Sequence, residues 1–402
     1  MRDSIFKINY KIIFVSIILF FLIRFWSPVF IFGTSIAPFY TLISKLITLV
    51  GILYYVMIYR KASVPFIIIT TYFAIRFFTT IVHCPQNLSR VFMGAYPILA
   101  IICIMEIFLE KNQYLFMNGF AFILRCLCVV NAIQSIICPN VFEHDGIYEY
   151  IIGGENQIVF AYIVSVIIEV ICHNERKKFL KFYIILLTLS IIKIFSAGNI
   201  LGWMIFLFLF FYYRKPRKIK AIKIFYVYCI GWGLIVVVRI QNIFSWLIIG
   251  ILHKNLTLTN RTVIWDNALS SIRLKPILGY GVQETVNLFY TYILRPGKPT
   301  VNSWFSAHNQ VVQTLYESGI LSMIPIIFFA VISLKKLDEN KKSRLYSVLV
   351  AGIIGILVSM IAEAPGWDSL LVVLALAFNV KKISTNFKLV GDNCVKYNSS
   401  SL

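Results

Sequence analysis

Residues 260–265 read NRTVIW, residues 275–281 read KPILGYG, and residues 306–319 read SAHNQVVQTLYESG. These motifs lie in the longest polar interval of a chain in which hydrophobic residues make up 59% and charged residues only 14%. The interval is therefore expected to stand outside a membrane that the rest of the chain crosses repeatedly.

The remainder of the chain has the composition of a membrane protein. Its mean hydropathy is +0.82, and its long apolar runs favour helices over a β-barrel, which would show short alternating segments. Because a helix needs about 20 apolar residues to cross a bilayer, the sequence predicts an all-α bundle of about twelve spans. They are expected at 11–32, 36–59, 64–82, 91–109, 119–138, 156–173, 179–195, 199–213, 222–240, 312–334, 345–362 and 367–380.

The distribution of charge predicts the orientation. The formal net charge is +21, and most basic residues lie in alternate short connections, which marks those connections and both termini as cytoplasmic. The same pattern argues against nucleic acid as a partner. We expect a single membrane domain over residues 1–385, with a large outer loop at 251–307 before the tenth span. The polar tail 386–402 is expected to be a disordered cytoplasmic segment.

The outer loop 251–307 breaks the charge pattern. It carries six cations, which are Lys254, Arg261, Arg273, Lys275, Arg295 and Lys298. A helix is expected from the N-cap Asn260 to Arg273. One face of this helix repeats at helical spacing and carries Arg261, Trp265, Leu269 and Ile272. Such a helix is predicted to lie on the membrane surface. A second helix is expected to begin near Ser303 or Ser306 and to continue into the tenth span.

His308 is the main candidate for catalysis within that second helix. A neutral imidazole can act as a general base near neutral pH. Asn309 and Gln313 lie one turn apart and are expected to hydrogen-bond a polar ligand on the same side. Gly319 would permit close helix approach. The simpler alternative is a histidine that only anchors the end of a helix.

Arginines form the second group of candidates. A cation at membrane depth costs about 2.5–3.5 kcal/mol on insertion scales, so it faces the bundle interior with a role or an ion pair. Arg76 and Arg125 lie within apolar runs, and Arg239 lies at the end of one. Arg261 has the guanidinium geometry to clamp a phosphate, and a solvated cation is its alternative. The carboxylates available for ion pairs with the membrane arginines are Glu106, Glu169 and Glu363.

Several function classes are disfavoured because their motifs are missing. The sequence has no Walker-type phosphate loop, no His-Glu-x-x-His zinc motif and no Gly-x-Ser-x-Gly elbow. It also contains no Asp-x-Asp pair, which a metal-dependent nucleotide-sugar transferase would need. Neither a metal nor another cofactor is therefore expected.

The three motifs together resemble those of the O-antigen polymerase and O-antigen ligase superfamily. The most specific part is His308-Asn309 followed by Gly319 after nine residues. The resemblance implies an all-helical bundle of the lipid-linked sugar transferase (GT-C-like) type in a bacterial inner membrane, with its active site facing the periplasm. It implies metal-independent glycosyl transfer, with undecaprenyl-diphosphate-linked oligosaccharides as donor and acceptor. The other partners implied are membrane lipid and a chain-length regulator and flippase of the same pathway.

The resemblance also implies residue roles. Arg261 matches an arginine that holds the diphosphate leaving group, and His308 matches a histidine proposed to activate the acceptor hydroxyl. Many relatives carry Ser-Arg or Thr-Arg where this chain has SAGN at 196–199, so a second arginine is missing there. The candidates to replace it are Arg76, Arg125, Arg239 and Arg273. The other residues expected to contact substrate are Asn309, Gln313, Trp265, Lys275 and Arg295.

Three activities follow from these observations. We expect a polymerase of O-antigen or a related surface polysaccharide, which moves the growing glycan onto the next lipid-linked repeat unit; the turn at 279–281 favours it. The closest alternative is an O-antigen ligase, which passes the glycan to lipid A-core. A solute transporter or flippase is the alternative from another class, and it would show broken spans at matching positions in two halves.

Overall fold

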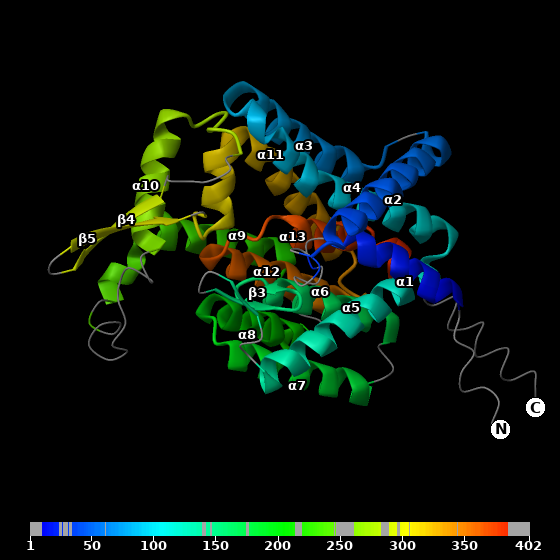
Figure 1. Ribbon diagram of the computed structural model, residues 1–402. Coiled ribbons are helices and arrows are strands. Elements are labelled where there is room, and N and C mark those ends of the chain that lie inside the picture. Colours follow the sequence, from blue (N-terminus) through cyan, green and yellow to red (C-terminus); the bar gives the residue numbers. More distant parts are fainter. Residues whose placement is uncertain are drawn as a thin grey trace, which may run out of the picture.

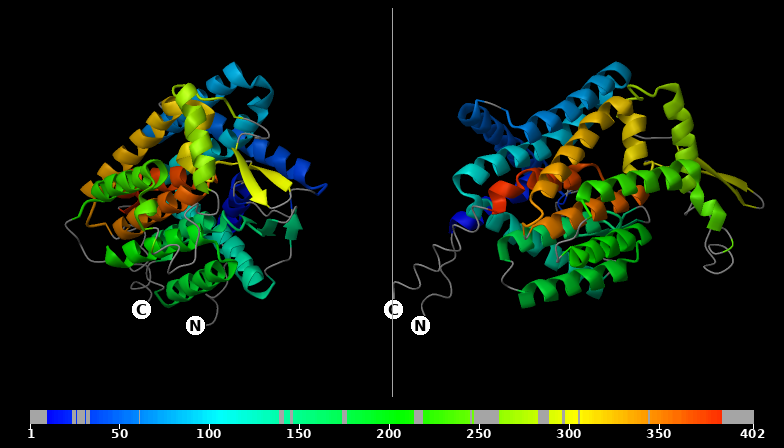
Figure 2. Two further views of the ribbon diagram at one scale, coloured as in Figure 1. Left: turned by 90° about the vertical axis from the view of Figure 1, so that its left-hand side faces the viewer. Right: turned by 180° about the vertical axis from the view of Figure 1, so that it is seen from behind.

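The structure is a computed structural model that describes residues 10–23, 26, 31, 34–60, 62–138, 142–144, 147–173, 177–213, 219–244, 246, 261–282, 289–295, 298–304, 306–343 and 345–384. The expected N-cap Asn260 and the expected tail 386–402 lie outside these residues. Within them the chain forms a bundle of helices, with α1 and α2 at one end and α10 at the other (Figure 1, Figure 2).

Thirteen α-helices form this bundle in the described part of the chain. They are α1 (Tyr10–Leu22), α2 (Ala37–Tyr59), α3 (Val64–His83), α4 (Leu88–Lys111), α5 (Gln113–Ile137), α6 (Ile158–His173), α7 (Lys177–Ile194), α8 (Ala197–Tyr212), α9 (Ala221–Gly233), α10 (Arg261–Leu274), α11 (Gln310–Glu339), α12 (Tyr346–Ala362) and α13 (Asp368–Phe378). Each predicted span overlaps one of them, and α10 is the helix expected in the outer loop.

Six segments are long and apolar enough to cross a membrane, and shorter apolar helices accompany them. The six are Ala37–Met57, Val64–His83, Pro85–Lys111, Gln113–Ile137, Ala221–Val238 and Gln310–Glu339. Large apolar side chains are exposed on the outer helices, among them Phe39 (62%), Phe182 (66%) and Phe208 (65%). Apolar surface of this extent is suited to lipid. The chain is therefore a multi-pass membrane protein.

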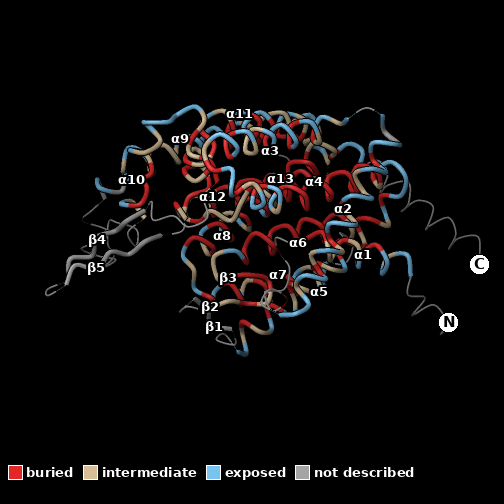
Figure 3. Tube along the Cα trace, turned by 45° about the horizontal axis from the view of Figure 1, so that its top comes forward, coloured by how far each residue is buried: buried red, intermediate tan, exposed pale blue. Residues whose placement is uncertain are grey.

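The centre of the bundle is formed by α6, α12 and α13. Nearly all residues of these three helices are buried (Figure 3). They are short because their ends meet polar connections that belong to the interior of the protein. One of these connections, between α12 and α13, carries Glu363 into the candidate site described below.

Two small antiparallel sheets lie in the connections of this otherwise helical fold. One has the strand order β1 (Phe142–His144), β2 (Ile147–Tyr150) and β3 (Gly153–Gly154). The other is a hairpin of β4 (Phe289–Arg295) and β5 (Lys298–Trp304), which pairs Phe289 with Trp304. Aromatic and β-branched residues along 289–304 favour strands. The pairing of the two strands extends to Arg295 and Lys298.

The predicted start of the second helix, near Ser303 or Ser306, is wrong. Ser303 lies in β5, and α11 begins at Gln310 with Asn309 as its N-cap. The Asn309 side chain accepts hydrogen bonds from the backbone N–H groups of Val311 and Val312 at 3.1 and 3.0 Å. His308 therefore precedes the helix and does not lie inside it.

The motif at 275–281 and Gly319 are two sides of one contact. Gly319 interrupts α11 with φ 65° and ψ −172°, which leaves backbone groups of the helix without their usual partners. The segment after α10 replaces those partners. Four backbone hydrogen bonds make the connection: Tyr280 N to Tyr316 O (2.9 Å), Gly281 N to Glu317 O (2.7 Å), Ile320 N to Pro276 O (2.9 Å) and Leu321 N to Ile277 O (3.4 Å). Gly319 thus permits the close approach of a loop, and not of a neighbouring helix.

Helix α10 is confirmed, and its apolar face is buried in protein. Ile264, Trp265 and Ala268 form that face. They pack in one cluster with Val236, Ala307, Val312 and Tyr316. Helix α10 is thereby fixed beside the start of α11.

Buried ion pairs account for two of the membrane arginines. Arg125 Nε donates to Glu169 Oε1 at 2.6 Å, so the ion-pair alternative is confirmed for Arg125. Arg76 pairs with Glu317 on α11, a carboxylate that the sequence analysis did not name. Both arginines therefore have structural partners within the bundle.

Candidate active site

His308 is presented by a strained turn between β5 and α11. Its φ of 45° lies in the left-handed region, where a side chain other than glycine costs of order 1–3 kcal/mol. Neighbouring contacts hold this conformation. Ala307 N donates to Gln313 Oε1 at 2.8 Å, Trp265 Nε1 donates to Ala307 O at 2.9 Å, and His308 N donates to Ser306 Oγ at 3.1 Å. Strain that the surroundings maintain in this way is typical of functional positions.

Glu363 joins His308 to Arg261. Its Oε1 lies 2.5 Å from a terminal nitrogen of Arg261, and its Oε2 lies 3.4 Å from His308 Nδ1. The Glu363 side chain is 6% exposed, whereas those of Arg261 and His308 are 21% and 23% exposed. The buried carboxylate therefore contacts two partly accessible groups: Arg261, which is cationic, and His308, which can accept a proton.

The start of α11 also positions Glu363. Asn309 Nδ2 donates to Ile361 O at 2.9 Å, at the end of α12. Gln310 Oε1 accepts from Gly366 N at 2.7 Å, just beyond Glu363. Two residues adjacent to His308 thus hold the α12–α13 connection in place, which fixes the carboxylate opposite the imidazole.

Asn309 consequently has a different role from the predicted one. It is fully buried, and Trp232 Nε1 donates a third hydrogen bond to its Oδ1 at 3.3 Å. An amide that is already bonded to α9, α11 and α12 is not available to a ligand. Asn309 is a positioning residue, and its place beside His308 has a structural reason.

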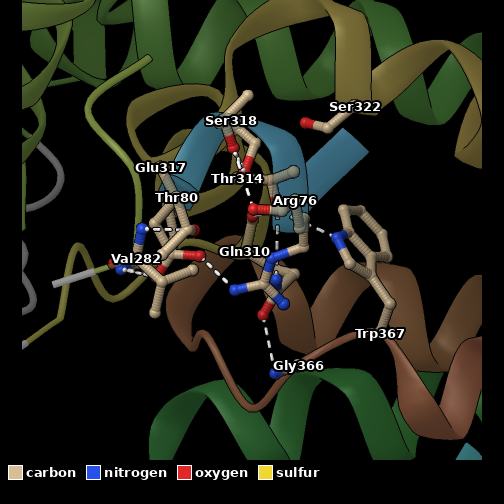
Figure 4. A network of polar contacts seen from close by, with 12 residues as sticks. Arg76, Thr80, Val282, Gln310, Thr314, Glu317, Ser318, Ser322, Gly366 and Trp367 are labelled. Carbon is tan, nitrogen blue, oxygen red and sulfur yellow. Dashed lines mark hydrogen bonds and ion pairs between the residues drawn. The ribbon is translucent and has the colours of Figure 1, made fainter. Parts of the chain in front are cut away.

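Gln313 links His308 to a second polar network. Its Oε1 accepts from Ala307 N, and its Nε2 donates to Glu317 Oε1 at 2.7 Å. Glu317 in turn pairs with Arg76 (Figure 4). Figure 4 also shows Trp367, which donates to Thr314 at 2.8 Å. Arg76 therefore belongs to a network between α3 and α11, and Gln313 connects that network to Ala307, the residue before His308.

Residues 196–199, where the resemblance leads us to expect a second arginine, lie beside this site. A Cβ added at Gly198 would stand 2.8 Å from the Cβ of Ala362, next to Glu363. Asn199, at the start of α8, donates to the backbone oxygen of Glu155. The structure therefore places residues 196–199 next to the site but provides no cation from them.

Among the four proposed substitutes, Arg239 is the one that the structure bonds to the residue after Arg261. It follows the π-helical turn Leu234–Val238 after α9. Its Nη2 donates to Thr262 O at 3.0 Å and to Asp266 Oδ1 at 2.5 Å. Its guanidinium carbon lies 5.2 Å from the centre of the Trp265 ring. The other terminal nitrogen, Nη1, is buried without a hydrogen-bond partner among the described residues. Arg239 is thus next to Arg261, with bonding capacity to spare.

The remaining predicted contacts lie apart or have other partners. Trp265 is 1% exposed, so its ring is not available to stack on a sugar. Arg273 and Lys275 are exposed at the far end of α10, about 18 Å from Arg261 at 1.5 Å per residue. The Lys275 ammonium lies 4.8 Å from the centre of the Tyr280 ring. Arg295 is the last residue of β4, and its side chain lies outside the described part of the chain.

Glu155 adds a second carboxylate to the electrostatics of the site. Burial raises the pKa of the Glu155 carboxyl above its ordinary value, Glu363 raises it further, and Arg261 lowers it. Because the folded pKa exceeds the unfolded pKa, ionised Glu155 opposes folding above the folded pKa. That cost disappears as the pH falls toward the unfolded value of about 4.3.

We expect Glu155→Gln to give a small rise in Tm at pH 7 to 8. The rise should shrink as the pH falls, because wild-type Glu155 then becomes neutral as well. Thermal unfolding of the purified protein over a pH series measures it. Glu149→Gln, in strand β2 of the same connection, is the matched control. A Tm gain that persists unchanged at low pH would contradict the explanation.

Glu363 is the site residue that the sequence analysis did not assign. It was named only as a possible ion-pair partner of membrane arginines, and its partner is Arg261 of the outer loop. A sequence signal exists: Glu363 is a lone carboxylate at the end of an apolar span and is followed by Ala364-Pro365-Gly366. Such a turn returns the chain to the bundle with its charge at the surface of the membrane.

Comparison with known proteins agrees with this site. Residues 179–327 match the family described as O-antigen ligase, a stretch that runs from α7 into α11 and contains Arg261 and His308. No curated protein matches the chain. Enzymes of this family transfer lipid-linked glycans in the synthesis of surface polysaccharides. Residues 179–327 of this chain are thus similar to the O-antigen ligase family.

Proposed function

We propose that the protein is a surface-polysaccharide polymerase that transfers a growing glycan from undecaprenyl diphosphate to the next lipid-linked repeat unit. One observation carries the proposal: Glu363 brings Arg261 and His308 together at a partly accessible point. A cation for a diphosphate and a base for a hydroxyl are the two groups that this transfer needs, because the sugar–diphosphate bond already has a good leaving group.

The reaction that we propose has one step. The acceptor hydroxyl oxygen attacks the anomeric carbon of the donor glycan, and His308 takes the hydroxyl proton. The bond from that carbon to the diphosphate oxygen breaks, and undecaprenyl diphosphate leaves with the electron pair. Arg261 stabilises the charge that develops on the leaving group. Glu363 holds the imidazole through Nδ1 and keeps it oriented, as a carboxylate does for a catalytic histidine elsewhere.

Arg239 is our proposal for the second diphosphate ligand. It adjoins Arg261 through Thr262 O, and its unpaired Nη1 is the strongest support. Of the other candidates, Arg76 is paired with Glu317 of α11, Arg125 is paired with the buried Glu169, and Arg273 lies at the far end of α10.

We expect Arg239→Ala to weaken use of the lipid-linked donor by about 10-fold or more, since a hydrogen bond to a charged group contributes about 1.5–3 kcal/mol. Arg273→Ala is the matched control on α10 and should behave as wild type. Donor-dependent rates of both purified variants measure the difference. Equal losses in the two variants would reject Arg239 as the diphosphate ligand.

The topology that we propose accompanies this chemistry. Both termini are cytoplasmic, about twelve spans cross the inner membrane, and residues 1–385 form one domain with the site facing the periplasm. The charge distribution of the connections supports this orientation. Membrane-impermeant labelling of single cysteines placed at exposed positions such as Asn267 and Lys342 tests it: only the first should be labelled from outside.

The ligase is the second candidate, because the matched family is described as O-antigen ligase. The turn at 279–281 no longer separates the two activities, since it packs against α11. Purified protein given only a lipid-linked repeat unit should make a ladder of longer lipid-linked products if it is a polymerase. Transfer only to added lipid A-core would identify a ligase. Flux across vesicles without any bond formation would identify a transporter and would overturn both.

A further inference from the structure

A long groove between α7 and α8 lies outside the proposed site. It has a volume of about 840 Å³. Its walls are largely apolar: Leu180, Ile184 and Leu189 of α7 face Leu207, Phe210 and Phe211 of α8 across it. Helix α8 packs along α12, where a Cβ at Gly202 would come 1.8 Å from Ser359 Oγ. Helix α7 does not pack against α8 in this close way, so the groove remains between these two helices.

Two lysines lie at one end of this groove. Lys177 and Lys181 line it and are exposed, one turn apart at the start of α7. Cations there face the positive end of the helix dipole, so an anion bound between them would be attracted by both the lysines and the helix. The sequence of the connection that follows α8 is also cationic, with Arg214, Lys215, Arg217 and Lys218. The groove is therefore cationic at one end and apolar along its length.

We propose that this groove binds an anionic phospholipid, with its phosphate at Lys177 and Lys181 and its acyl chains between α7 and α8. Cationic pockets between membrane helices recognise such head groups. The volume also lies within the range of about 300–1,000 Å³ that is typical of small-molecule sites.

The lipid-linked substrate is a different occupant. Lys181 is about 20 Å along α7 from its other end, at 1.5 Å per residue. That other end leads into residues 196–199, which adjoin Glu363. A polyprenyl diphosphate with its phosphates at the lysines could not reach Arg261. The groove is therefore a second lipid site, and it does not depend on the proposed function.

A lipid in this groove would stabilise a wall of the site. A short turn joins α7 to α8. Asn199, which follows this turn at the start of α8, donates to the backbone oxygen of Glu155. Filling the space between the two helices fixes the hairpin that ends in this turn. The effect is expected in the thermal stability of the whole protein.

The test compares the full-length protein in phosphatidylcholine nanodiscs that contain increasing fractions of phosphatidylglycerol. The wild-type Tm should rise by several degrees with phosphatidylglycerol, and native mass spectrometry should detect retained phosphatidylglycerol. Lys177→Gln/Lys181→Gln should lose most of the rise. Lys178→Gln should keep it, because Lys178 is exposed between the two lysines but does not line the groove. Leu180→Trp keeps both lysines and fills the groove, and it should lose the rise as well.

Several outcomes would overturn the proposal. An equal loss of the Tm rise in Lys178→Gln would show that general surface charge, and not binding in the groove, causes the rise. If the Tm rise were unchanged in the double variant, the two lysines would not bind the phosphate. If it were unchanged in Leu180→Trp, the acyl chains would not occupy the groove. A rise with polyprenyl phosphate in pure phosphatidylcholine, but none with phosphatidylglycerol, would assign the groove to the substrate lipid.

Discussion

Replacing His308 by alanine is expected to reduce polymer formation by about 100-fold or more, the smaller end of what a general base contributes. The variant should fold, because the backbone contacts of the turn are made by Ala307, Trp265 and Gln313 and not by the imidazole. Synthesis of lipid-linked polymer by the purified variant, at matched Tm, measures the loss.

His83→Ala is the matched control for this prediction. His83 is the last residue of α3, and its Nδ1 lies 3.0 Å from Thr79 O, so this histidine has a local structural partner and no carboxylate in the site. Its loss should leave the rate near that of wild type. A fully active His308→Ala variant would show that the acceptor hydroxyl is activated by another group.

Replacing Gly319 by alanine is expected to destabilise the protein by about 3 kcal/mol or more, as backbone strain and steric overlap combine. A Cβ at this position would stand 2.0 Å from the carbonyl oxygen of Ile277. Neither that oxygen nor α11 can move aside easily, because hydrogen bonds join the two segments. The folded fraction and Tm in detergent measure the effect.

Gly94→Ala in α4 is the control for an added methyl group, since a Cβ there meets no atom within 4 Å. This variant should keep the wild-type Tm or gain slightly, because alanine favours helix. If Gly319→Ala were equally stable, the contact between α11 and residues 276–282 would not hold the fold together.

The sequence was sufficient to locate the spans and insufficient to locate the strands. Apolar length alone predicts a membrane helix, so each predicted span overlaps a helix. The hairpin of β4 and β5 depends on pairing between residues such as Phe289 and Trp304. The aromatic and β-branched residues of this stretch favour strands, but its turn residues suit a hairpin and a loop between two helices equally, so the sequence does not specify the pairing.

The candidate site was predictable only in part for a similar reason. Arg261 and His308 stand in recognisable motifs, but their connection through Glu363 joins α10, the start of α11 and the end of α12. Sequence position carries no information about such a meeting. Asn309 illustrates the converse, because its place in the motif reflects helix capping and contact with α12, and not contact with a ligand.

The position of Glu363 has a consequence for selectivity. Arg261 already holds a carboxylate partner, so an anion that binds there meets a negative charge that the protein itself supplies. A dissolved anion with a single charge, such as chloride or acetate, gains little in that environment. A diphosphate offers two charged groups at once and can engage Arg261 and a neighbouring cation together. If the protein acts as we propose, Glu363 therefore favours the lipid-linked diphosphate over the common anions of the surroundings.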